Sequence, residues 1–87
     1  LVGAQDIAWD LAGAWAEFGL SPEEEAQLAE TAGLGPDSGL LAFLKPCYLA
    51  FQLGAFAMAA DAHAGWPAEA ARLRRRSDTY ASLLSRL

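Results

Sequence analysis

The sequence contains few side chains that could do chemistry, and their spacing matches no catalytic motif. His63 is the single histidine, with Asp61 nearby, and Cys47 is the single cysteine, so a metal site made of these residue types is excluded. The sequence has no glycine-rich phosphate loop, no G-x-S-x-G and no H-E-x-x-H. We therefore expect no catalytic residue and no bound metal or cofactor within these 87 residues.

Asp10 is the acidic residue whose position needs an explanation. It lies in the second turn of the first expected helix, and residues 1–44 contain eight acids and no Lys or Arg that could pair with it. If this helix is central, the carboxylate is at least partly buried and needs hydrogen-bond donors. Those donors would be backbone amides of a segment outside the helix. The alternative is that Asp10 faces water near the helix start.

Basic residues are concentrated in the second half, where residues 45–87 carry six bases and three acids. The run of Arg72, Arg74, Arg75 and Arg76 predicts a solvated helix face, with Glu69 pairing with Arg72 and Asp78 with Arg74. Because the whole chain has a net charge of −5, we expect no nucleic-acid partner. The single cysteine and the lack of a signal-peptide pattern at the start favour a reducing, cytoplasmic location.

The elements that position these residues are predicted to be helices. Apolar residues make up 54% of the chain, and Val2, Ile7, Thr31 and Thr79 are its four β-branched residues. Good helix formers therefore dominate, and residues suited to strands are scarce. We predict an all-α fold of about four helices in one helical domain over residues 1–87, which we interpret as the C-terminal part of a longer chain.

The first two helices have clear start and stop signals. Asp6 is the expected N-cap of the first helix, which ends at Gly19 and is apolar on both sides, so it should be central in the domain. Ser21, Pro22 and Glu24 form the N-cap, N1 and N3 positions of a capping box that opens the second helix. Its apolar stripe is thin, which predicts a surface position; the stripe comprises Leu28, Ala29 and Ala32.

The third helix is predicted from about Ser38 to about Ala62, bent at Pro46 and packed against the first. Residues 40–60 are long enough to cross a bilayer, but they include Lys45, Pro46 and Gln52, so we expect a buried core helix, with a membrane span as the minor alternative. A fourth helix should run from Pro67 to the C-terminus. Its apolar face comprises Leu73, Tyr80, Leu84 and Leu87.

The segment Asp6-Ile7-Ala8-Trp9-Asp10-Leu11-Ala12 resembles the D-P-x-x-D-L-A segment of aminoglycoside phosphotransferases and their choline-kinase-like relatives. In that family the segment opens the first helix after the catalytic and metal-binding loops. Both aspartates and the Leu-Ala pair match, whereas Ile7 stands where the family usually has proline. The resemblance implies that Asp10 hydrogen-bonds the backbone of the catalytic loop and that Asp6 is the helix cap.

The same resemblance implies that the parent protein is an ATP- and Mg-dependent phosphotransferase of a small-molecule acceptor. The family's H-x-D-x-x-x-x-N loop and metal-binding Asp lie upstream of this segment and are not present here, so the partner of this chain would be the upstream catalytic part of the same protein. Tyr48 and Gln52 are candidates for the acceptor-pocket wall, and ordinary packing is the alternative for both. The alternative function is a non-catalytic interaction module, a homodimer that buries Trp9, Trp15 and Phe18 against a second copy.

Overall fold

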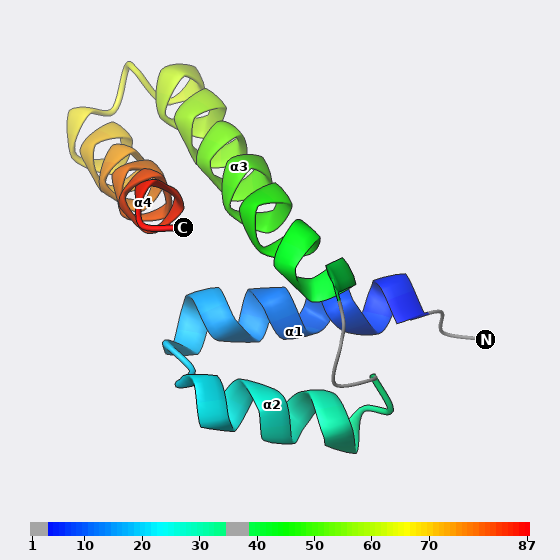
Figure 1. The fold of residues 1–87 in the computed structure, drawn as a ribbon. Coiled ribbons are helices and arrows are strands. Elements are labelled where there is room, and N and C mark those ends of the chain that lie inside the picture. The colour runs from blue at the N-terminus through cyan, green and yellow to red at the C-terminus, as the bar shows by residue number, and fades with distance from the viewer. Residues whose placement is uncertain (1–3, 35–38) are drawn as a thin grey trace. The chain divides into compact units, whose positions relative to one another are not determined.

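A computed structural model describes residues 4–34 and 39–87, which form four α-helices and no strand (Figure 1). The helices are α1 (Ala4–Phe18), α2 (Pro22–Thr31), α3 (Gly39–Ala62) and α4 (Pro67–Ser85). The prediction of an all-α fold with four helices is confirmed. The chain divides into two compact units, an N-terminal unit, Leu1–Tyr48, and a C-terminal unit, Leu49–Leu87.

α1 begins at Ala4, three residues before the predicted first helical residue Ile7, and this corrects the role assigned to Asp6. Because the helix starts at Ala4, Asp6 is its third residue and is not the N-cap. Alanine and glutamine favour helix, so nothing in the sequence stops the helix from extending backwards past Asp6. The carboxylate of Asp6 still lies in the first turn, where the helix macrodipole favours negative charge.

One side of α1 forms the core of the N-terminal unit. Ala8, Leu11 and Ala12 are buried there. Phe18, which the spacing placed on the same apolar face, is 81% exposed. It is the last helical residue, and the chain turns away immediately afterwards at Gly19, whose φ of 64° is readily adopted only by glycine.

The capping box of α2 is confirmed. The Ser21 hydroxyl accepts a hydrogen bond from the Glu24 backbone N–H at 3.1 Å, and the Glu24 carboxylate accepts one from the Ser21 N–H at 3.0 Å. No residue of α2 is buried, which confirms the predicted surface position. Local capping therefore does more to define this helix than burial does.

α3 is less buried than predicted, so the expectation of a buried core helix is wrong. Its buried apolar residues are Leu41, Tyr48, Leu49 and Ala60. Three large apolar side chains are instead mostly exposed, namely Phe43, Phe51 and Met58. By length and composition alone α3 could span a membrane, a test that core helices of soluble proteins also pass.

The C-terminal unit is held together by the inner face of α4. Leu73 and Tyr80 are buried as predicted, and the Ser77 hydroxyl between them donates a hydrogen bond to the Leu53 carbonyl of α3 at 3.0 Å. The Tyr80 ring lies 5.7 Å from the Phe56 ring. Leu87, predicted on the same face, lies beyond the end of α4 and is 60% exposed.

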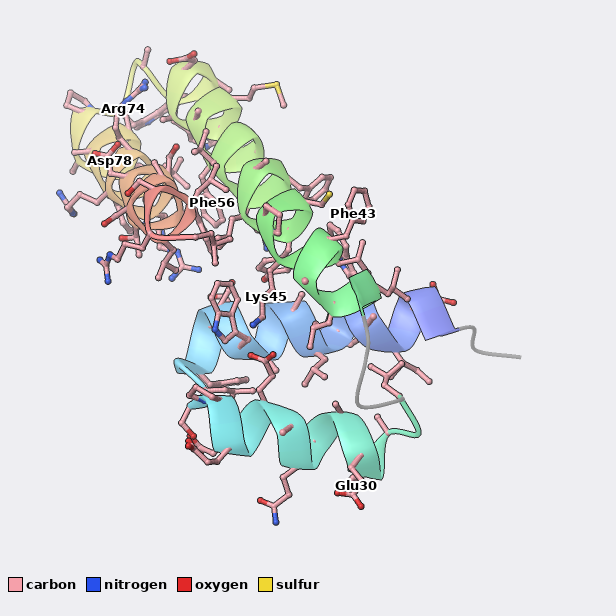
Figure 2. The ribbon with its side chains drawn as sticks, in the orientation of Figure 1. Glu30, Phe43, Lys45, Phe56, Arg74 and Asp78 are labelled. Atoms are coloured by element: carbon pink, nitrogen blue, oxygen red, sulfur yellow. The ribbon has the colours of Figure 1, made fainter. Side chains whose placement is uncertain are left out.

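The arginines of α4 are largely engaged within the C-terminal unit. Arg72 pairs with Glu69 as predicted, at 2.5 Å. Arg74 pairs with Asp61 of α3 at 2.7 Å and not with Asp78, whose side chain lies one helical turn further along α4 (Figure 2). Arg76 lies over the Phe56 ring at 5.2 Å. These contacts neutralise part of the predicted basic face.

We expect Ser21→Ala to destabilise α2, because it removes the hydroxyl that accepts the Glu24 N–H. The loss should be about 1 kcal/mol, measurable by urea denaturation or by faster amide exchange in the first turn of α2. An unchanged exchange rate would contradict the importance assigned to this cap.

The same variant should move the pKa of Glu24. Hydrogen bonds from the Ser21 backbone and side chain hold this pKa below its ordinary value, so the pair stabilises the fold at neutral pH and loses this effect as pH falls through the lowered pKa. Ser21→Ala should raise the Glu24 pKa part of the way back in an NMR titration, whereas Glu23→Gln, in the same turn, should leave it nearly unchanged.

Candidate functional site

Asp10 lies on the exposed side of α1, so the expectation that it is partly buried is wrong and the alternative, a side chain facing water, holds in this chain. The reason is helical geometry. At 3.6 residues per turn, Asp10 points away from the stripe formed by Ala8, Leu11 and Ala12. The Leu-Ala pair that follows Asp10 thus anchors α1 in its core, while the carboxylate stays accessible from outside. Its contact with a catalytic loop stays a prediction.

Tyr48 is buried and takes part in the packing of α3 on α1 within the N-terminal unit. Its hydroxyl donates a hydrogen bond to the Glu17 carboxylate at 2.7 Å, and its ring meets the Trp9 ring edge-on at 5.4 Å. A Cβ added at Gly13 would lie 3.1 Å from the Tyr48 ring, so the absence of a side chain there leaves room for the ring. Gln52, the other predicted wall residue, is half-buried and belongs to the C-terminal unit.

The described part of the N-terminal unit contains a cleft of about 710 Å³. Its walls are one face of α2, the first turns of α3, Trp15 of α1, and the loop residues Leu20 and Leu34. Neither Tyr48 nor Gln52 lines this cleft. The side chains that define it are Trp15, Leu20, Ala26, Ala29, Leu41 and Lys45.

An ion pair closes one side of the cleft. The Lys45 ammonium lies 2.6 Å from the Glu25 carboxylate, and both side chains are mostly buried, with 18% and 19% of their surface exposed. The same ammonium lies 4.7 Å from the centre of the Trp15 ring, within reach of a cation–π interaction. Figure 2 shows Lys45 extending from α3 toward this site. The pair joins α2 to α3.

These residues do not fit the cofactors that the resemblance implies for the parent protein. Over residues 4–34 and 39–87 there is no group of three His, Cys, Asp or Glu side chains that could hold a metal ion. The cleft offers one cation, Lys45, which is already paired, and two carboxylates, Glu25 and Glu30. A triphosphate needs unpaired cations or converging backbone N–H groups. We therefore assign neither ATP nor Mg to these residues.

Sequence reasoning missed the Lys45–Glu25 pair because its members lie 20 residues apart on different helices. A signal for Lys45 was nevertheless present. It is the single charged residue between Leu40 and Ala60, and a lone charge in an apolar run usually has a partner. The partner could not be chosen from the sequence, because the second helix offers several glutamates in its first turn.

Comparisons with known proteins do not assign a family. The sequence matches no protein-family model, no curated protein and no solved structure.

We expect Glu25→Gln to lower the free energy of unfolding by about 1–3 kcal/mol, because it leaves the mostly buried ammonium of Lys45 without a counter-charge. Glu23→Gln is the matched control, since it removes the same charge from the same turn of α2 at an exposed position. Both variants lose a negative charge that favours the N-terminus of α2, but only Glu25→Gln also loses the ion pair. The difference between their free energies of unfolding in urea therefore measures the contribution of the pair. Equal effects of the two substitutions would show that the pair contributes nothing.

Proposed function

We propose that this chain is the helical C-terminal part of a kinase-like, ATP-dependent phosphotransferase of small molecules, in which α1 supports the catalytic loop. The observation that carries the proposal is the arrangement of the Asp6–Ala12 segment. Leu11 and Ala12 are buried, whereas Asp10 projects away from this core with its carboxylate exposed. A carboxylate in this position can accept backbone N–H hydrogen bonds from a loop that lies outside the chain.

The charge of the N-terminal unit supports a role in positioning for Asp10. Lys45 is the single Lys or Arg in residues 1–48, and it is bound to Glu25. Asp10 therefore has no local cation to compete for its lone pairs. Backbone amides, which are neutral, are suitable donors in such an acidic environment. Under this proposal the catalytic base, the metal ligands, ATP and Mg all belong to the upstream part of the protein.

The decisive test uses the longer protein encoded in frame with this segment. Translation of the DNA upstream of Leu1 should give an H-x-D-x-x-x-x-N motif followed by a further Asp. The purified protein should then consume ATP when offered a suitable hydroxyl compound. A start codon or an unrelated linker in place of that motif would exclude the proposed function.

Asp10→Asn tests the role assigned to α1. In the longer protein it should lower kcat about tenfold or more, which corresponds to a loss of about 1.4 kcal/mol of transition-state stabilisation. In the 87-residue chain it should change the free energy of unfolding by less than about 0.5 kcal/mol, because the side chain is exposed. Asp78→Asn, at an exposed position of α4, is the control for both measurements. A destabilisation of the short chain by more than about 1 kcal/mol would instead assign Asp10 a local partner.

A second candidate function, a non-catalytic interaction module, is favoured by the exposed face of α3. Phe51 and Met58 are 63% and 70% exposed and lie seven residues apart, which places them on the same side of the helix. An exposed apolar face of this kind is covered by another polypeptide in many proteins. In the first proposal the covering segment is the rest of the same chain, and in the second it is a second copy.

Sedimentation shows whether the exposed face of α3 is covered by the rest of the same chain or by a second copy. If it is a dedicated module, it should form a defined dimer that melts cooperatively, and Phe51→Ser with Met58→Ser should make it monomeric. Trp9 and Trp15 pack within the N-terminal unit, against Tyr48 and Lys45, so this dimer would use the exposed face of α3 in place of the predicted contact of Trp9, Trp15 and Phe18. Phe18→Ser, which removes the exposed member of that predicted contact, should leave the dimer intact. If the chain belongs to a phosphotransferase, the longer protein should sediment without a dimer that depends on Phe51 and Met58.

A further inference from the structure

The cleft of the N-terminal unit is larger than the packing of its helices requires. At about 710 Å³ it falls within the range of small-molecule sites, roughly 300–1,000 Å³. The cause lies in the sequence of α2, whose cleft-facing residues include the small side chains Ala26 and Ala29. Each of these side chains ends at its Cβ and so fills little of the space. The space is therefore bounded by ordered helices and is not filled by their side chains.

The lining defines what can occupy this space. Besides the alanines, the walls are mainly leucine and the indole of Trp15. The two charged groups on the inner wall, Lys45 and Glu25, neutralise each other at 2.6 Å. Glu30 contributes to the rim, and its side chain extends outward into solvent (Figure 2). No buried side-chain nitrogen or oxygen among the described residues lacks a hydrogen-bond partner. The walls therefore do not require a polar group on the occupant.

We infer that this cleft is a binding site for an uncharged, apolar small molecule. Burial of apolar surface supplies the free energy of binding, since apolar cavities in proteins take up hydrocarbons in this way. A cationic ligand would have to displace Lys45 from Glu25 and from the Trp15 ring, and an anionic ligand would have to compete with Glu25 for Lys45. Both costs disfavour charged ligands. The inference goes beyond the proposed function and does not depend on it.

Two dyes that share the same rings test the charge of the ligand. N-Phenyl-1-naphthylamine is uncharged, and 1-anilinonaphthalene-8-sulfonate carries a sulfonate. The uncharged dye should bind the 87-residue chain with one site per chain and at least about tenfold more tightly than the sulfonate, a difference of about 1.4 kcal/mol. Tighter binding of the sulfonate would show that Lys45 is available to anions and would overturn the inference.

Substitutions at two alanines, one in the cleft and one outside it, test where the dye binds. Ala29→Phe should fill the cleft and weaken binding of the uncharged dye about tenfold or more. Ala50→Phe adds the same side chain at an exposed position of α3 and should leave binding unchanged. Phe51→Ser should also leave it unchanged, which distinguishes the cleft from the exposed face of α3. Loss of binding in Phe51→Ser, or normal binding in Ala29→Phe, would place the dye elsewhere and refute the site.

Circular dichroism shows whether the filled variant retains its helices. If Ala29→Phe loses helicity, Ala26→Leu provides the same test with a smaller added volume, and it should weaken binding in proportion to the volume filled. Unchanged binding in a helical Ala26→Leu chain would count against the cleft. Energy transfer from tryptophan to the bound dye should fall in Trp15→Phe, because Trp15 lines the site. Unchanged transfer would likewise contradict the assignment.

Discussion

The N-terminal unit depends on the contact of one aromatic ring with α1. Tyr48 meets Trp9 with its ring, approaches α1 where Gly13 has no side chain, and donates its hydroxyl to Glu17. These three residues are spaced four apart, so they form one stripe of α1 along which a single side chain is bound. The fixed position of α3 on α1 in turn brings Lys45 to Trp15 and Glu25.

Alanine determines how much of the apolar surface this chain can bury. It is the most abundant residue and an excellent helix former, but each alanine covers little area when two helices meet. The helices therefore form with few large side chains between them, and among the described residues Leu49 is the largest side chain that is fully buried. The same property leaves two features on the surface, the cleft beside Ala26 and Ala29 and the exposed face around Phe51 and Met58. Both features follow from the high alanine content of the chain.

Local signals in the sequence predicted most of the fold, and long-range contacts account for the errors. The capping box at Ser21, the Pro67 start of α4 and the Glu69–Arg72 pair each involve residues within one turn, and each is confirmed. The pairing of Arg74 with Asp61 and of Lys45 with Glu25 joins different helices, which residue spacing cannot indicate. The burial of α3 and of Asp10 was overestimated for a related reason. Apolar periodicity identifies a face but not the element that covers it.

The charge distribution restricts how this chain could serve a phosphotransferase. Residues 1–44 carry eight acids and no Lys or Arg, and the first base that follows, Lys45, is held by Glu25. Such a field disfavours a nearby triphosphate, so a nucleotide would have to be bound and neutralised by residues outside the N-terminal unit. The same field does not oppose a neutral loop that donates backbone N–H groups to Asp10. An acidic supporting helix and a separately bound nucleotide are thus compatible, provided that the nucleotide lies outside this unit.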